Sequence, residues 1–374
     1  MKKRLAGFYF CICISAVVLT GCRDVQEVWK PVGEDNTIRL ALTGDEEFYT
    51  ESGNMEAMEL AASDFYERTG ISVEIVPYDD ETDYHKAIAC ANEIVQDTGI
   101  AAVLVEQELD YIDTIADIYE EGKKPFLITT GCYNHTIDQG YRYLIADFIN
   151  AESAGEIMGR YIIDQGFRRV AFCHSDTEYE EDELKGLQES ITGSATVLAD
   201  TVVGPFTQEE FEIAYSRWEA LGIDVVCVSN YYCLNSDLVR MLRQKGSELQ
   251  VVSDYVMDTD EDIETNGKYM EGTVIVPSYL CGTSEKGELV EQRFQEKYGM
   301  DMPERAAQSY DLVMMLAEGL VSGIEDTNGL MDYLKREEGY EGIHGRVLFD
   351  EKGALIPRGD EVLVFSDGSF RSRR

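Results

Sequence analysis

The feature that most constrains the fold is an alternation of short apolar runs with helical stretches, in two successive series. The runs of the first series are 38–43, 71–78, 100–106, 125–130 and 141–146. The runs of the second series are 168–175, 196–203, 224–230, 249–255 and 273–279. Strands that alternate with helices form parallel sheets covered on both faces. We therefore predict an α/β protein with two lobes.

Two lobes of this kind predict where a ligand binds. Open α/β sheets bind ligands beyond the carboxyl ends of their strands. Two such edges that face one another enclose a ligand from both sides, and hinge closure follows naturally. The length of 374 residues suits two domains of ordinary size.

The composition argues against several partners and chemistries. With 72 acidic and 32 basic residues, the net charge is −40 at pH 7, which repels nucleic acids and anionic lipid surfaces. The cysteines after residue 22 form no CxxC motif or Cys/His cluster, so we predict neither a metal site nor a cofactor. The 4 histidines are scattered, and P-loop, GxGxxG and GxSxG motifs are absent. We predict a protein that is not an enzyme, although an enzyme without a recognisable motif stays open.

The N-terminus has the pattern of an export signal. Three basic residues at 2–4 precede the apolar run 6–19, which spans about 21 Å as a helix and is shorter than the roughly 30 Å core of a bilayer. The segment Leu19-Thr20-Gly21-Cys22 resembles a bacterial lipobox. The resemblance implies a signal peptide over 1–21, a diacylglyceryl group on Cys22 and a tether over 22–36. It predicts attachment through lipid to the extracytoplasmic face of the cell membrane.

The last third of the chain carries a family resemblance. QSYDLVMMLAEGL (308–320), followed by YEGIHGRVLFDEKG (340–353), is similar to the C-terminal signature of type I periplasmic solute-binding proteins of the leucine/isoleucine/valine-binding class. The similarity covers most of 38–370. It implies two Rossmann-like lobes with parallel sheets, joined by a three-crossover hinge. Lobe one would comprise 37–146 plus 279–340, and lobe two 147–278 plus 341–370.

The same resemblance implies a role and a set of binding residues. The protein would capture a small solute and pass it to the permease of an ABC importer. The candidate ligand-binding residues follow predicted strands, and they are Thr129, Thr130, Tyr179, Tyr231, Asp254, Ser278, Glu106 and Gln107. In the family, the position of Asp254 often carries an acid that pairs with a ligand ammonium. Asp254 could also cap a helix, and the two threonines could cap the segment that follows them.

The nature of the solute is predicted from charge. Glu106 and Glu108 stand where the family has small neutral residues, and Asp254 lies on the opposite lobe. Carboxylates that converge on one cleft repel each other unless a cation lies among them, so we predict an amino acid or related amine. Residues 143–172 also resemble the sugar-binding relatives of this fold. A sugar-binding or sensory receptor, with aromatic stacking on Tyr231, Tyr232 and Tyr255, is therefore the alternative.

The lipid anchor is directly testable. When the gene is expressed in a bacterium fed labelled fatty acid, the wild-type protein should carry the label. Replacing Cys22 with Ser removes the thiol that receives the lipid and should abolish labelling. Label that persists on the variant, or is absent from the wild type, would contradict the assignment.

Overall fold

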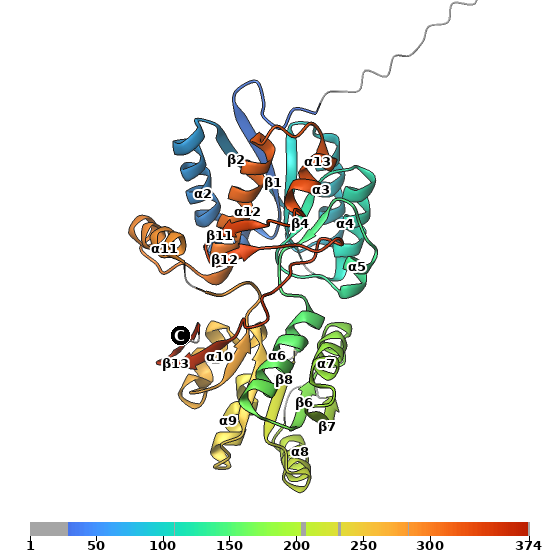
Figure 1. Ribbon diagram of the computed structural model, residues 1–374, viewed down its shortest axis with the longest axis vertical. Helices are drawn as coiled ribbons and strands as arrows, with labels where there is room; N and C mark the ends of the chain where they lie inside the picture. Colours follow the sequence, from blue (N-terminus) through green and yellow to red (C-terminus); the bar gives the residue numbers. More distant parts are fainter. Residues whose placement is uncertain (1–28, 108, 203–206, 231–232, 283, 373–374) are drawn as a thin grey trace, which may run out of the picture.

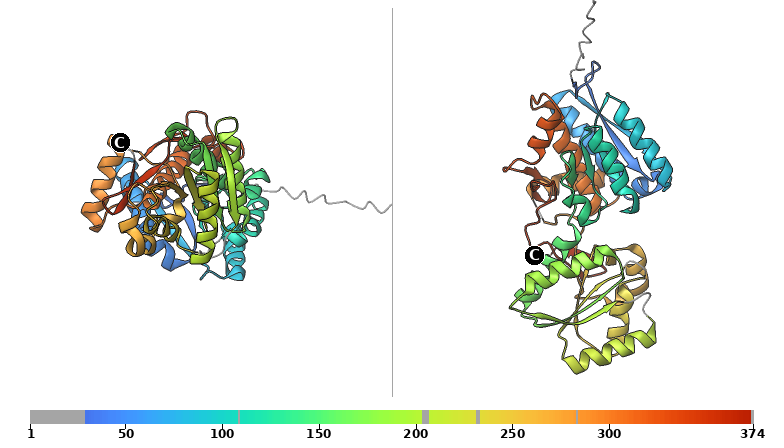
Figure 2. Two further views of the ribbon diagram at one scale, coloured as in Figure 1. Left: turned by 90° about the horizontal axis from the view of Figure 1, so that it is seen from below. Right: turned by 90° about the vertical axis from the view of Figure 1, so that its right-hand side faces the viewer.

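The computed structural model describes residues 29–372 apart from 108, 203–206, 231–232 and 283. The predicted signal peptide, Cys22, Glu108, Tyr231 and Tyr232 therefore lie outside the described residues. The chain forms two α/β lobes, one above the other in Figure 1, and extended segments join them. The view from the side in Figure 2 shows the same two separate bodies. The predicted fold class is confirmed.

The first lobe is built on a five-stranded sheet of order β2-β1-β3-β4-β5, in which every pairing is parallel. Its strands are β1 (Thr37–Gly44), β2 (Ser72–Asp79), β3 (Ile100–Glu106), β4 (Phe126–Ile128) and β5 (Leu144–Ala146). Every residue of β3 is buried, as a central strand covered by helices on both faces requires. The edge strand β2 is only partly buried.

The helices of the first lobe come from both ends of its sequence (Figure 1). The early ones are α1 (Glu46–Glu51), α2 (Asn54–Thr69), α3 (Tyr84–Gln96), α4 (Leu109–Glu121) and α5 (Asn134–Asp138). The late ones are α11 (Glu285–Tyr298), α12 (Glu304–Val321) and α13 (Thr327–Leu334). Asp83 caps α3, because its carboxylate accepts from the backbone N–H groups of His85 and Lys86.

The second lobe is built on a seven-stranded sheet of order β14-β13-β10-β9-β8-β6-β7. The strands are β6 (Arg169–His174), β7 (Thr196–Val202), β8 (Val225–Ser229), β9 (Gln250–Asp254), β10 (Val274–Val276), β13 (Leu363–Ser366) and β14 (Ser369–Ser372). Strands β6 to β10 are parallel, whereas β13 and β14 add an antiparallel edge. The helices are α6 (Ala151–Gln165), α7 (Glu178–Ile191), α8 (Gln208–Leu221), α9 (Ser236–Gln244) and α10 (Asp260–Asn266), with the 3₁₀ turns η1 (Tyr255–Met257) and η2 (Gly267–Tyr269).

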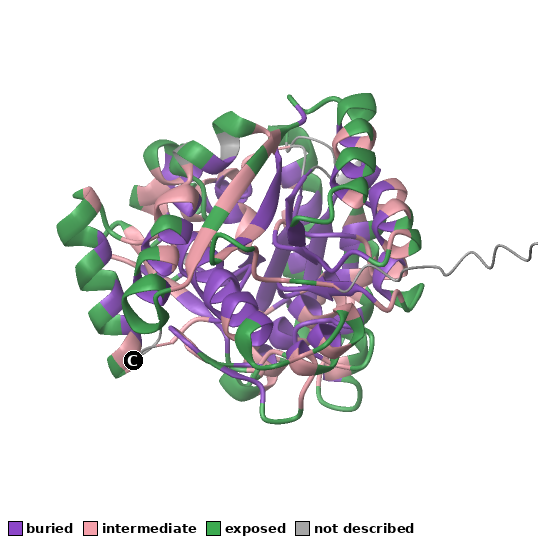
Figure 3. Cartoon of the chain, turned by 90° about the horizontal axis from the view of Figure 1, so that it is seen from above, coloured by how far each residue is buried: buried purple, intermediate pink, exposed green. Residues whose placement is uncertain are grey.

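Successive strand residues supply two cores, one on each face of the second sheet. Val170 and Phe172 pack on the α6–α7 side, in a cluster that continues through the first lobe. Ala171 and Cys173, the alternate residues of β6, pack with Trp218 on the opposite side. Figure 3 shows buried residues along the strands and exposed ones on the outer faces of the helices.

Glycines allow α6 and α7 to pack backbone against backbone. A Cβ atom on Gly155 would lie 1.9 Å from the carbonyl oxygen of Glu183, and one on Gly186 would lie 2.0 Å from that of Glu152. Real side chains do not tolerate such distances. This close approach holds the first turns of α7, which carry the candidate Tyr179, against α6.

One predicted boundary is wrong. We expected residues 341–370 to join the second lobe, but the hairpin of β11 (Tyr340–Gly342) and β12 (Gly345–Val347) lies in the first. The Ile343 N–H donates to the buried Asp311 carboxylate of α12 at 3.0 and 2.8 Å. Ala354 also pairs with Ala146 at the end of β5. These bonds keep 341–355 with the first sheet, so the third crossing comes after residue 355.

Within the described part of the chain, none of the helices combines the length and the hydropathy that a bilayer crossing requires.

The α6–α7 contact predicts a sharp stability effect. Gly155→Ala should lower the free energy of unfolding by about 1–3 kcal/mol, because the new methyl group has no space without separating the helices. The matched control is Gly267→Ala, where the nearest atom to the new Cβ would be 3.5 Å away. Urea denaturation of residues 23–374 measures both. Equal stability of the two variants would contradict the close packing.

Candidate functional site

The carboxyl edges of the two sheets face the segments that cross between the lobes. Strand β5 ends at Ala146 and β10 ends at Val276, and each leads directly into a crossing. The Ile149 N–H donates to the Ser278 carbonyl at 2.7 Å, which ties the first two crossings together. The predicted binding residue Ser278 is buried, and its carbonyl group takes part in the hinge.

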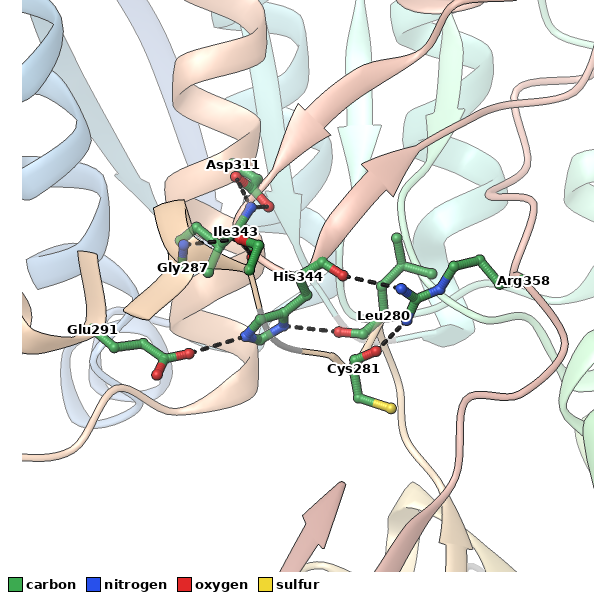
Figure 4. Close-up of polar contacts among 9 residues, drawn as sticks. Leu280, Cys281, Gly287, Glu291, Asp311, Ile343, His344 and Arg358 are labelled. Carbon is green, nitrogen blue, oxygen red and sulfur yellow. Dashed lines mark hydrogen bonds and ion pairs between the residues drawn. The ribbon is translucent and has the colours of Figure 1, made fainter. Parts of the chain in front are cut away.

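Arg358 ties the third crossing to the second. Figure 4 shows its guanidinium between the carbonyl groups of His344 and Cys281. Its Nε also donates to the buried Glu361 carboxylate at 2.9 Å. His344 donates through Nδ1 to the Leu280 carbonyl at 2.9 Å and lies 3.4 Å from Glu291. Hydrogen bonds thus connect all three crossings.

The threonines predicted at the first-lobe edge lie there, and β3 and its following loop engage both hydroxyls. Thr129 Oγ1 donates to the Val105 carbonyl at 3.2 Å. Thr130 Oγ1 donates to the Gln107 carbonyl at 3.0 Å. Each oxygen can still accept a hydrogen bond, but its proton is used within the lobe. Both acceptors precede the threonines in the chain, so these bonds tie the end of β4 to β3 and its loop and do not cap the segment that follows.

Glu106 and Gln107 are also held by their own lobe. Asn54 Nδ2 lies 3.0 and 3.2 Å from the two carboxylate oxygens of Glu106. Gln107 Nε2 donates to the buried Asp80 carboxylate at 2.6 Å. Burial raises the pKa of Glu106, and the Arg305 guanidinium and the Asn54 amide oppose that effect. We predicted that Glu106 would join Asp254, but its carboxylate is engaged by Asn54.

At the second-lobe edge, the structure brings Tyr179 and Asp254 together. Asp254 is the last residue of β9 and is 0% exposed, and Tyr179 lies in the first turn of α7 at 8%. Ser229 Oγ, at the end of β8, donates to Asp254 at 3.2 Å. Burial raises the pKa of Tyr179, and the nearby Tyr255 and Asp254 raise it further.

Two acids that were not predicted from the sequence lie beside Asp254. Glu180 accepts a hydrogen bond from Ser175 Oγ at 2.6 Å. Glu183 is 0% exposed, and neither of its carboxylate oxygens has a hydrogen-bond partner among the described residues. Burial raises the pKa of Glu183, and the charge of Asp254 adds to the effect. The sequence does offer one indication that Glu183 lies near the site: it follows Tyr179 by four residues and therefore shares its helix face.

These groups make the second-lobe edge strongly attractive to a cation. Burial and the charge of Glu180 raise the pKa of Asp254 to about 7, although the Ser229 hydroxyl opposes the shift. An ammonium group placed here would favour the ionised carboxylate and form charge-assisted hydrogen bonds. In the described part of the chain, no group of three or more His, Cys, Asp or Glu is arranged to hold a metal ion.

The raised pKa of Asp254 predicts a pH-dependent stability. The folded protein binds this proton more tightly than the unfolded chain, so wild type loses stability as pH rises from about 4 to about 7. Asp254→Asn removes that loss. Without ligand, its advantage over wild type should grow through this window, by at most about 1.4 kcal/mol per pH unit, and level off above it.

Urea denaturation at a series of pH values measures the difference. Glu337→Gln, which neutralises an exposed acid, is the control and should follow wild type. A constant difference between Asp254→Asn and wild type across the window would show that Asp254 has an ordinary pKa in the folded protein.

The sequence is similar to those of known amino-acid-binding proteins. The leucine-specific-binding protein of Salmonella typhimurium is 26% identical over 304 residues, which are 79% of this chain and 80% of that protein. The Leu/Ile/Val-binding protein of Escherichia coli K12 is 23% identical over 332 residues, or 87% of each chain.

Solved structures show the same fold. An ABC transporter substrate-binding protein from Desulfitobacterium hafniense in complex with Leu superposes with a TM-score of 0.78 at 21% identity, over 90% of this chain and all of that one. Residues 40–358 match the family described as periplasmic binding protein. This confirms the resemblance inferred from the C-terminal signature: the chain belongs to the periplasmic binding protein family, whose members bind solutes for transporters and are not enzymes.

Proposed function

We propose that this protein captures an amino acid or a related small amine between its lobes and delivers it to the permease of an ABC importer. The observation that carries the proposal is the buried Asp254, at the carboxyl end of β9, with Tyr179 and Ser229 beside it. Buried carboxylates without a cationic partner are costly, and an ammonium group would supply the missing charge.

The named relatives support this class of solute. They are a leucine-specific-binding protein, a Leu/Ile/Val-binding protein and a substrate-binding protein in complex with Leu. The three-crossing hinge also supports capture by closure, because it leaves both carboxyl edges free to approach each other.

The first lobe favours a ligand whose main charge is positive. Its edge presents threonine oxygens that can accept hydrogen bonds and the buried Glu106, which Asn54 engages. Arg305 brings a positive charge near this edge, and that charge acts on Glu106 in one lobe and on Tyr255 in the other. A zwitterion could therefore place its ammonium at Asp254 and its carboxylate towards Arg305.

The sugar-type receptor is the second candidate, and aromatic residues favour it. Tyr179 and Tyr255 flank Asp254, and rings at such an edge can stack on a pyranose. Sensing in place of transport is compatible with either ligand. We further propose that the lipid on Cys22 anchors the protein outside the cytoplasmic membrane, as the lipobox resemblance implies.

A ligand screen tests the proposal. Purified residues 23–374 are scanned by thermal shift with amino acids, small amines, short peptides and sugars. A ligand held at 100 times its Kd should stabilise the protein by roughly 2.7 kcal/mol. Stabilisation by an amine-bearing solute is expected. Stabilisation by neutral sugars alone would contradict the amine, and catalytic turnover of a compound would contradict a binding protein.

Two variants identify the group that recognises the ligand. Asp254→Asn should weaken binding of an amine by about ten-fold or more, because a charge-assisted hydrogen bond is lost. Tyr231→Ala should have the smaller effect. Calorimetry at pH 8, where Asp254 is ionised, measures both affinities. An Asp254→Asn protein that binds normally, beside a Tyr231→Ala protein that does not bind, would favour the sugar-type site.

A further inference from the structure

A histidine of the first lobe lies between two carboxylates, one from each lobe. His135 is in α5, and its Nε2 lies 2.6 Å from Asp113 Oδ2 of α4 in the same lobe. Its Nδ1 lies 2.5 Å from Glu178 Oε1, at the first residue of α7 in the second lobe. The Tyr133 ring stacks on the imidazole, with 5.4 Å between ring centroids and an angle of 15°. Figure 1 shows α5 at the lower rim of one lobe and α7 at the upper rim of the other.

The two short contacts require a charged imidazole. Ionised carboxylates only accept hydrogen bonds, and a neutral imidazole carries a single N–H. A neutral His135 could therefore bond to one lobe but would turn a lone pair towards the carboxylate of the other. Only the imidazolium donates to both.

The surroundings of this bridge strengthen the requirement. Asp113 is fixed from its own lobe, because Thr136 Oγ1 donates to its second oxygen. Other charged groups at this rim include Asp138 on α5, Glu152 on α6, Asp182 and Lys185 on α7, and Lys352, on which Asp350 also acts. Lys185 pairs with Glu152 at 3.0 Å and Lys352 with Asp138 at 2.6 Å, so each lysine is engaged within its own lobe.

We propose that protonated His135 is a pH-dependent bridge that holds the two lobes together at the rim of the ligand site. The bridge rests on the proposed solute-binding function only for its effect on affinity, because the contact itself joins protein side chains. Asn134 Nδ2, which lies 3.3 Å from Glu152, reinforces the same rim from the neighbouring position of α5.

The direction of the effect follows from proton linkage. Asp113 first, and then Glu178, raise the pKa of His135, so the bridged arrangement binds the proton more tightly than the separated one. The bridge is therefore complete at acidic pH and is lost as pH rises through the raised pKa of His135. The adjacent residue, Tyr179, lies at the proposed site, so closing this rim draws that edge towards the first lobe.

The first test needs no ligand. The histidine ring signals of isotope-labelled residues 23–374 are titrated by NMR, and the His135 signal is assigned by its absence in His135→Gln. Glu178→Gln should lower the pKa of His135, because the partner carboxylate of the other lobe is lost. Glu181→Gln, which neutralises an exposed acid on the same helix, is the control. A Glu178→Gln protein with the same His135 pKa as the control would overturn the bridge.

The second test measures how far apart the two lobes lie. Small-angle scattering of wild type should give a smaller radius of gyration at pH 5.5 than at pH 8.5. In His135→Gln, the part of this change that depends on His135 should be absent. His85→Gln, a change on the exposed face of α3, is the control and should behave as wild type. Identical curves for wild type and His135→Gln at both pH values would overturn the proposed hold on the lobes.

A third test applies once a ligand is known. The ratio of wild-type to His135→Gln affinity should fall about two- to five-fold between pH 5.5 and 8.5, a modest change because an exposed ion pair contributes little. Asp254 titrates in both proteins, so its effect on affinity cancels in the ratio. If no ligand is found, the solute-binding proposal fails while the first two tests still decide the bridge. A pH-independent ratio beside a confirmed ligand overturns the bridge alone.

Discussion

The hydrogen bonds among the three crossing segments are the constraint on which the rest of the structure depends. Ile149 bonds to Ser278, and Arg358 joins the third crossing to the carbonyl groups of Cys281 and His344. Because β5 and β10 both end at these crossings, the carboxyl edges of both sheets face the same gap. Segments tied side by side can bend together, and each lobe can then move as a body.

The second constraint is an excess of negative charge at these edges. A surface carboxylate is solvated at little cost, but Asp254, Glu183 and Glu106 are almost completely buried. Asn54 engages Glu106 in the first lobe, whereas Glu183 and Asp254 share one end of the second lobe with a few hydroxyl groups. Asp147, which follows β5 in the first lobe, is also buried, and neither of its carboxylate oxygens has a hydrogen-bond partner among the described residues. Both lobes therefore bury acids at the edges that face the crossings.

The fold could be predicted from the sequence because its signals are local. Each apolar run with its flanking glycine or polar residues specifies a strand, and the order of strands and helices specifies a parallel sheet. The third crossing was misplaced because the hairpin before it carries no local sign of its lobe. Its position is set by Asp311, which accepts from Ile343 across 32 positions of the chain.

The candidate site could be predicted only in part, for a related reason. The family resemblance predicted Tyr179 and Asp254 together, and the structure brings them together because residues that follow parallel strands meet at one edge. Glu183 was not predicted, because it stands in the acidic run EYEEDELKG (178–186), where only its spacing of four residues from Tyr179 sets it apart from the solvated acids. The packing of α7 on α6 at Gly155 buries it, and that contact is tertiary.

The same charge imbalance governs the approach of the lobes. Glu178 and Asp182 on α7 face Asp113 and Asp138 of the first lobe, and like charges at this distance oppose closure unless a positive charge lies between them. Deep in the gap, a ligand ammonium at Asp254 can supply that charge. At the rim, the imidazolium of His135 supplies it. Both act only where groups from the two lobes converge, so an acidic protein of this kind closes around positive charge and opens when that charge is removed.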